Sequence, residues 1–166
     1  MNKVTVEELT MEAFAPFGYF DGFIDPNVEK FGNPPIEFFR DQLQIHLPPR
    51  NSVSYSTCRV EPRPYVIDVT EYHSSTGEGN LPLDNDILIH VAPAVPGGDP
   101  FPSDRVRVFR VPQGTLVYLK PSVWHHAPFT ANSKPANTLI ILPERTYADD
   151  CIVEELRNPI EIDYRY

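Results

Sequence analysis

The chain has 166 residues, 23 acidic and 14 basic side chains, and a net charge of −9 at pH 7. This length is typical of one domain, so we expect residues 1–166 to form a single domain. The acidic balance argues against nucleic-acid binding, which needs a basic surface, and against binding to anionic membranes. No apolar run approaches the ~20 residues of a membrane-spanning helix. Nineteen prolines spread along the chain argue against a bundle of long helices.

The two cysteines indicate a compartment. Cys58 and Cys151 are far apart in the sequence, lie in apolar contexts and form no zinc-binding motif. We therefore expect two reduced, packed thiols in a cytoplasmic protein. Residues 1–8 fit this expectation, because they are acidic and lack the basic-then-apolar order of a secretory signal peptide.

The first 40 residues are predicted to be a helix followed by an extended arm. The helix is predicted at residues 5–14, capped by Thr5 and ended by Pro16. Residues 18–24 are predicted to be extended. Residues 26–40 are rich in Pro, Asn and Gly, which is typical of a loop.

A series of short strands is predicted to follow. The signals are alternating or continuous apolar residues between turns that contain Pro, Gly, Asn or Asp. They occur at residues 42–47, 53–60, 65–73, 87–92, 106–111, 115–119 and 137–142. Residues 151–157 are predicted as a short helix or strand, and residues 92–102 as the loop of a long surface hairpin. This pattern predicts an all-β sandwich or barrel, with the barrel at residues 41–150.

One predicted strand end carries candidate metal ligands. Glu71 and His73 are two residues apart at the end of the strand 65–73, so both side chains point to one face. Glu78 follows a turn of small residues, and a return of the chain brings it to the same face. Two carboxylates and an imidazole that converge inside a barrel offer three ligands to a divalent metal ion.

A second segment supplies further histidines. The predicted strand 115–119 runs through a proline turn into His125 and His126. Adjacent residues of a strand point to opposite faces, so we expect only one of these two histidines to enter the site as a fourth ligand. His46 and His90 have no partner in the sequence, and we expect them to pack in the core or lie on the surface.

These two segments resemble the paired motifs of the cupin superfamily, G-x5-H-x-H-x4-E (or x3) and G-x5-P-x-G-x2-H. The stretch Glu71-x-His73-x4-Glu78 has the spacing of the first motif, with Glu71 in place of its first histidine. The interval from Gly114 to His125 has the overall spacing of the second motif.

At Lys120 and Ser122 the chain departs from the Pro and Gly of the second cupin motif. The resemblance nevertheless implies a cupin-type double-stranded β-helix, or jelly-roll, barrel. It also implies a divalent metal ion, with nickel, zinc, manganese and iron as candidates. His125 becomes the expected ligand, and His126 an outward or supporting residue.

A closer resemblance is to the ureidoglycolate lyase family within the same barrel class. That family carries an E-R-H-P type segment, a strand that ends in a Val-Ala-like stretch, and a Y-H-x-x-V-W-H-H-P type segment. The corresponding stretches here are residues 71–74, 88–92 and 122–128, in the same order. The resemblance implies a metal-dependent lyase that cleaves the C–N bond of ureidoglycolate to give glyoxylate and urea, or acts on a related small hydroxy or keto acid.

The same resemblance implies roles for individual residues. Glu78 is a candidate base as well as a candidate metal ligand, and Lys120 or His126 is the candidate acid. Lys120 is also the first candidate for binding the carboxylate of a small anionic substrate, ahead of Arg59 and Arg107. The family has Gln near the position of Glu78 and His near that of Lys120, so the chain differs from it at both positions.

Family members are typically dimers, so the resemblance implies a homodimer. Exposed strand edges of an open barrel also need to be covered. The candidate interface or barrel lid is formed by Phe14, Phe17, Phe20 and Phe23, whose alternative is simple packing against the barrel.

Two other functions fit a metal-binding barrel of this kind. A sugar or sugar-acid isomerase or epimerase is one alternative, because a metal site also suits enediolate chemistry. The other is a non-catalytic cupin that binds a small ligand and serves as a sensor.

Overall fold

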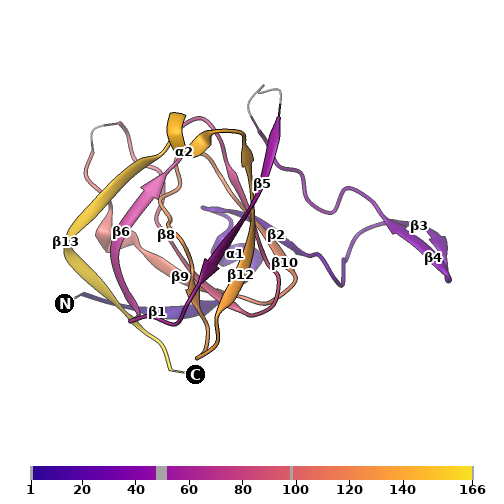
Figure 1. Ribbon diagram of the computed structural model, residues 1–166, viewed down its shortest axis with the longest axis horizontal. Helices are drawn as coiled ribbons and strands as arrows, with labels where there is room; N and C mark the ends of the chain where they lie inside the picture. Colours follow the sequence, from indigo (N-terminus) through magenta and orange to yellow (C-terminus); the bar gives the residue numbers. More distant parts are fainter. Residues whose placement is uncertain (1, 48–51, 98, 166) are drawn as a thin grey trace.

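The computed structural model describes residues 2–47, 52–97 and 99–165, and β-strands dominate it (Figure 1). One sheet has six strands: β1 Asn2–Glu8, β6 Val66–Tyr72, β8 Ile87–Val91, β9 Arg107–Val111, β11 Phe129–Thr130 and β13 Ile152–Asp163. Their order is β11-β8-β9-β1-β13-β6. A second sheet has five strands: β2 Gly18–Gly22, β5 Val53–Val60, β7 Glu78–Pro82, β10 Thr115–Leu119 and β12 Ala136–Pro143. Their order is β2-β10-β7-β12-β5.

The helical segments are short. They are α1 Met11–Phe14, a 3-10 turn at Ser103–Arg105, and α2 Thr146–Asp149. Among the described residues, no helix is long and apolar enough to cross a bilayer. The predicted all-β fold is confirmed as two main sheets, although the described strands do not close into one continuous barrel ladder.

Two clusters of buried apolar side chains form the core. The first core cluster combines residues of both sheets and α1, with Phe14, Phe17 and Phe109 in mutual ring contact. The second core cluster packs strands of the six-stranded sheet against Trp124 and Phe101. Phe14 and Phe17 are 0% and 3% exposed, so these two residues of the predicted subunit interface belong to the core instead.

A two-residue bridge links distant parts of the six-stranded sheet. The backbone of Trp124 exchanges hydrogen bonds with Ala92, directly after β8, at 2.9 and 3.0 Å. The backbone of His125 exchanges hydrogen bonds with Glu71, on the edge strand β6, at 2.6 and 2.8 Å. Residues 124 and 125 therefore hold the end of β8 and the end of β6 around one interior.

The helix predicted at residues 5–14 is wrong over most of its length. The first half of β1 pairs in parallel with β13, and its second half pairs in parallel with β9. Only Met11–Phe14 is helical, and Thr10 rather than Thr5 caps it, accepting a hydrogen bond from the backbone N–H of Ala13 at 3.2 Å. Two ladders, together with packing onto the second core cluster, outweigh the local helix signal.

Residues 26–40, predicted as a loop, contain a hairpin instead. β3 Lys30–Asn33 and β4 Ile36–Phe39 pair antiparallel and project away from both sheets as an arm (Figure 1). Phe31, Ile36 and Phe38 on this arm are 54%, 79% and 63% exposed. Two of the prolines that suggested a loop, Pro34 and Pro35, lie in the hairpin turn, and Gly32 lies in β3 with a positive φ of 82°.

The strand predicted at residues 42–47 is also wrong, because this segment joins no ladder. From Leu43 onwards its alternating pattern instead matches alternating burial, with Leu43, Ile45 and Leu47 half-buried and Gln44 and His46 exposed. The hydroxyl of Tyr19 donates to the carbonyl of Gln44 and ties the segment to β2. One-sided packing on a sheet thus gives the same period of two as strand pairing.

The remaining strand predictions agree with the structure, with two additions. The segment predicted at residues 151–157 as a helix or strand is the start of β13, and residues 92–102 join the antiparallel strands β8 and β9. The central strand β7 and the short strand β11 were not predicted. The composition of β7 resembles a turn, yet all five of its residues are buried between β10 and β12. A side chain at Gly79 would meet Ile45 and Ile141 at 2.9 and 3.1 Å, so a larger residue would force these two side chains to shift.

Candidate active site

Glu71 and His73 come from the end of β6. The residue between them, Tyr72, points the other way and packs on Trp124 with ring centroids 4.5 Å apart. The alternation of an extended chain therefore turns Glu71 and His73 to the same side. One ligand atom each from Glu71, His73 and His125 lie within 4.8 Å of one another.

His125 reaches this point through the bridge to β6. Glu71 and His125 are directly opposite in an antiparallel pair, so their side chains share a face. The turn before His125 is held by the N–H of Ser122, which donates to the carbonyl of His73 at 2.7 Å. As a result, the imidazole rings of His73 and His125 lie 5.2 Å apart, centroid to centroid.

Glu78 enters from the first position of β7, where it pairs with Leu119 of β10. One carboxylate oxygen, Oε2, lies 3.0 Å from Nε2 of His73 and 3.5 Å from Nε2 of His125. The other oxygen, Oε1, accepts a hydrogen bond from the side-chain amide of Asn80 at 3.0 Å. Glu78 is 7% exposed, so the four groups proposed from sequence meet in the interior.

The backbone fixes which nitrogen of each imidazole carries the hydrogen. Nδ1 of His73 lies 2.7 Å from the carbonyl of Asp150, and Nδ1 of His125 lies 2.8 Å from the carbonyl of Val123. A carbonyl only accepts, so both Nδ1 atoms donate and the neutral rings leave Nε2 as a bare acceptor. Both Nε2 atoms then face the carboxylate of Glu78, which also only accepts.

Acceptors that face each other need a cation between them. Nε2 of His125 is buried and has no hydrogen-bond partner among the described residues. Either a proton or a metal ion satisfies this arrangement. Imidazole nitrogens whose other N–H is held by a carbonyl, together with carboxylates, are a usual ligand set for a divalent transition metal. The residues present therefore fit a metal ion.

The charges of the cluster are coupled. Burial alone would raise the pKa of Glu78, but the facing imidazoles, His125 foremost, lower it overall. Burial alone would lower the pKa of His125, but the carboxylate of Glu78 raises it overall. Burial and the neighbouring Glu71 carboxylate raise the pKa of Cys151 to about 12, so this thiol stays neutral and donates to Glu71 at 3.3 Å.

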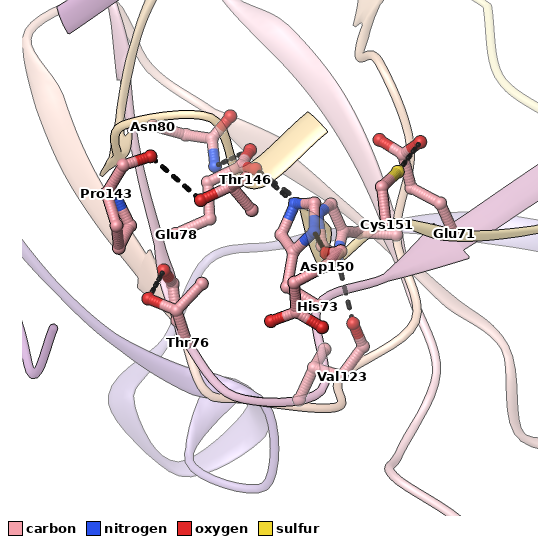
Figure 2. Close-up of polar contacts among 12 residues, drawn as sticks. Glu71, His73, Thr76, Glu78, Asn80, Val123, Pro143, Thr146, Asp150 and Cys151 are labelled. Atoms are coloured by element: carbon pink, nitrogen blue, oxygen red, sulfur yellow. Dashed lines mark hydrogen bonds and ion pairs between the residues drawn. The ribbon is translucent and has the colours of Figure 1, made fainter. Parts of the chain in front are cut away.

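Asp150 holds the turn that follows His73. Its carboxylate accepts the backbone N–H and the hydroxyl of Ser74 at 2.8 and 2.6 Å, and those of Ser75 at 2.9 and 2.5 Å. Its backbone carbonyl accepts the hydrogen bond from the ring Nδ1–H of His73 (Figure 2). Figure 2 also shows Cys151, the next residue, beside Glu71. The segment between α2 and β13 thus orients two members of the cluster.

A cleft of about 380 Å³ adjoins the cluster. Glu71 and Glu78 line it, together with Ser56 of β5, His126 after the bridge, and Tyr147 of α2. No lysine or arginine among the described residues lines this cleft. Its polar lining therefore consists of carboxylates, an imidazole and neutral hydrogen-bonding groups.

The cations proposed from sequence lie elsewhere. Lys120 is exposed, and its ammonium donates to the carbonyl of Ala15 at 2.6 Å, so the structure does not bring it to the cluster. Arg59 pairs with Glu61 at 3.0 Å. Arg107 pairs with Glu7 on the outer side of β1 and β9. The turn that delivers His125 directs Lys120 towards α1 instead, which the spacing of the motif does not reveal.

His46 and His90 were expected to pack in the core or lie on the surface, and the structure agrees. His46 is exposed, and His90 is 2% exposed inside the core. Sequence reasoning missed Asp150, Asn80 and the closeness of Cys151 to Glu71. Asn80 sits two residues after Glu78 on one strand, so recognising β7 would have placed the two side chains together. Asp150 and Cys151 are distant in sequence and carry no local signal.

Comparison with known proteins gives a consistent assignment. The sequence model of the ureidoglycolate lyase family matches residues 1–163. Two curated proteins named ureidoglycolate lyase, from Pseudomonas savastanoi pv. phaseolicola and Pseudomonas syringae pv. syringae, are each 31% identical over 140 residues. These matches cover 81% of this chain and 79% of each relative.

Solved structures of oxalate decarboxylase are more distant. One from Bacillus subtilis has a TM-score of 0.44 at 17% identity, covering 63% of this chain and 24% of that chain. Another has a TM-score of 0.44 at 14% identity, covering 76% of this chain and 35% of that chain. This chain thus spans about a quarter to a third of the oxalate decarboxylase chains that it matches. By the full-length family match and the identity to curated relatives, the chain belongs to the ureidoglycolate lyase family.

Proposed function

We propose that this protein is a metal-dependent ureidoglycolate lyase, which cleaves the C–N bond of a small hydroxy acid to give glyoxylate and urea. Membership of the family supports the reaction. One observation carries the metal dependence: the bare Nε2 atoms of His73 and His125 face the carboxylate of Glu78 at 3.0 and 3.5 Å. Three acceptors in a buried space call for a cation.

Glu71, His73 and His125 are the proposed ligands of a divalent ion, and Glu78 contacts both imidazoles. When bound, the ion supplies a Lewis acid that polarises an oxygen of the substrate. The mixture of imidazole and carboxylate suits nickel, zinc, manganese or iron.

Two proton transfers are needed. The hydroxyl proton leaves as the aldehyde carbonyl of glyoxylate forms, the C–N electron pair goes to nitrogen, and that nitrogen takes up a proton as urea departs. Glu78 is the proposed base and His126 the proposed acid, because both side chains line the cleft. Lys120 receives no role, because its ammonium is bound to the carbonyl of Ala15.

Turnover of ureidoglycolate tests this proposal directly. Protein loaded with one divalent metal at a time is incubated with the substrate, and glyoxylate is measured with and without a chelator. We expect turnover in at least one metal form and its loss on chelation. Glu78→Gln should lower kcat by about 100-fold or more while the metal is retained. Lys120→Met, the matched change of an exposed charge, should retain activity.

Each other outcome identifies an alternative. Loss of metal in Glu78→Gln would make Glu78 a ligand. A metal-loaded protein that leaves ureidoglycolate intact but exchanges carbon-bound protons of keto sugars in deuterated water would be an isomerase or epimerase. A protein that binds no metal and turns over neither substrate would be a non-catalytic ligand-binding cupin.

We also propose a homodimer in the cytoplasm. The exposed apolar side chains of the arm, Phe31, Ile36 and Phe38, support burial of this hairpin against another copy. Two free thiols, Cys58 and Cys151, support a reducing compartment. Sedimentation at micromolar concentration should give a dimer, and the pair Ile36→Ser with Phe38→Ser should give a monomer. A monomeric wild type would refute the dimer, and recovery of the native protein outside the cytoplasmic fraction would refute the location.

A further inference from the structure

A second cavity, of about 280 Å³, adjoins the cleft at His126, which lines both. One wall is β6 and another is Phe129 of β11. The polar side chains that line it are Arg63, Asp68, His90 and His126. None of the proposed metal ligands lines this cavity, so it needs a separate explanation.

His90 presents an acceptor that lacks a donor. The hydroxyl of Thr70 donates its single hydrogen to the carbonyl of His125 at 3.2 Å. The same hydroxyl oxygen lies 3.3 Å from Nε2 of His90, so it accepts there and Nε2 carries the ring hydrogen. Nδ1 of His90 is therefore a bare acceptor, buried and without a hydrogen-bond partner among the described residues. Burial lowers the pKa of His90 to about 3, in agreement with a neutral ring.

Arg63 supplies donors on the same cavity. Its Nη2 group donates to the carbonyls of Ala127 and Pro128 at 2.9 and 3.1 Å, and its guanidinium lies 4.1 Å from the ring centroid of Phe129. No bond from its other N–H groups to a described residue is observed, so they remain available to a ligand. The side chain is thus held in place by one nitrogen and by the contact of its guanidinium with Phe129, while donors stay free.

The balance of charges selects the ligand class. The guanidinium of Arg63 and the carboxylate of Asp68 line one cavity, so their charges offset each other. An anion would meet Asp68, and a cation would meet Arg63. A neutral group that carries both a carbonyl and N–H groups satisfies the donors of Arg63 and the acceptors of His90 and Asp68 together.

We propose that this cavity binds the ureido group of the substrate and the urea released from it, a proposal that rests on the proposed lyase function. The ureido carbonyl accepts from Arg63, and a ureido N–H donates to Nδ1 of His90. Since His126 lines both cavities, the proposed acid then stands where the ureido nitrogen joins the reacting carbon. The carboxylate and hydroxyl of the substrate remain on the cleft side.

Two substitutions of His90 separate recognition of the ligand from packing. His90→Gln places its amide near the Nε2 position, so it keeps the contact with Thr70 and removes the acceptor at Nδ1. His90→Asn places an amide oxygen near the Nδ1 position and gives up the contact with Thr70. The probe is urea at non-denaturing millimolar concentration, followed by NMR of imidazole nitrogens in the zinc-loaded protein.

The expected result is a saturable shift of the His90 nitrogens in the wild type. His90→Gln should weaken urea binding by about 10-fold, whereas His90→Asn should stay within about threefold of the wild type. Arg63→Met, which keeps a long unbranched side chain but removes the guanidinium, should weaken binding as His90→Gln does and serves if that variant fails to fold. No saturable shift in the wild type, or equal affinity of His90→Gln and the wild type, would overturn the site.

Failure of the site and failure of the lyase are distinguishable, because urea binding is measured without turnover. A protein that binds urea through His90 but leaves ureidoglycolate intact keeps this site and loses the proposed reaction. A protein that cleaves ureidoglycolate with a KM indifferent to His90→Gln keeps the reaction and loses this site.

Discussion

The buried histidines His73, His90 and His125 divide into two kinds. His73 and His125 hold their Nδ1 hydrogens against backbone carbonyls at 2.7 and 2.8 Å, so their Nε2 atoms face a carboxylate. His90 holds its Nε2 hydrogen against the hydroxyl of Thr70 at 3.3 Å, and its Nδ1 atom is left without a partner. The same residue type thus carries opposite tautomers within one protein.

The difference shows how the partner of one ring nitrogen sets the use of the other. Where the free nitrogen meets carboxylates, only a cation removes the conflict between acceptors. Where the free nitrogen belongs to a side chain that lines a cavity with a guanidinium, a neutral donor suffices. The following substitutions break or sharpen this division, from the largest expected effect to the smallest.

Loss of the imidazole of His73 or His125 should have the largest effect on metal binding and activity. His125→Ala, and separately His73→Ala, should reduce bound metal from near-stoichiometric to trace levels and lower kcat/KM by about 100-fold or more. Elemental analysis and the glyoxylate assay measure both. His46→Ala removes an exposed histidine and should change neither. Full metal content in His125→Ala would refute its role as a ligand.

Asp150 supports the orientation of His73, although it is not one of the proposed metal ligands. Asp150→Ala removes the acceptor that holds Ser74 and Ser75, so the orientation of His73 is lost in part. We expect metal affinity to fall by about 10- to 100-fold, measured by competition with a chromogenic chelator. Asp104→Ala, at an exposed position, is the control. Unchanged affinity in Asp150→Ala would show that the chain holds His73 without this carboxylate.

Acid should remove the contribution of Asp150 to stability. Burial alone would raise its pKa, but hydrogen bonds from Ser74 and Ser75 lower it to about 2. A lowered pKa means that the contribution, roughly 2 kcal/mol, is complete above the ordinary value of about 3.9 and disappears as the pH falls through about 2. Chemical unfolding of the metal-free wild type and Asp150→Asn should therefore converge across this window. A constant difference between them down to pH ~2 would contradict it.

Thr70→Val should have the smallest effect of the four. It removes the acceptor of His90 and the donor to the carbonyl of His125, at a cost of about 1 kcal/mol in the free energy of unfolding. Metal content should be unchanged. Thr138→Val is the matched control, because the buried hydroxyl of Thr138 has no hydrogen-bond partner among the described residues. A loss in Thr138→Val equal to that in Thr70→Val would mean that the Thr70 contacts add nothing.

Strand prediction succeeded where the alternation of apolar and polar residues within one segment matches the burial of that segment. Residues 53–60 and 137–142 alternate in the sequence, and β5 and β12 pair along their whole common length. It failed where pairing partners decide the outcome. β1 reads locally as a helix, but it fills the gap between β9 and β13, and the glycine and proline of β7 look like a turn although that strand is central. Only the partners provide the ladder that overrides the local signal.

The candidate site divides in the same way. The spacing of Glu71 and His73 predicted a shared face, and the structure brings both to His125 and Glu78. Lys120 belongs to the same sequence motif, yet its ammonium binds the carbonyl of Ala15. Direction within a turn depends on its backbone angles, as at Ser122 with a φ of 64°, and residue spacing does not encode them.

By itself, the sequence determined the all-β character, the acidic balance and the residue types that converge in the interior. These properties are local, since a period of two along a strand assigns each side chain to a face before any partner is known. The tertiary structure decided which nitrogen of each histidine is free, that Asp150 holds His73 across 77 positions of sequence, and that His90 opens onto a second cavity. Those facts depend on carbonyls and hydroxyls from strands far apart in the chain, and only folding places these groups within hydrogen-bonding distance.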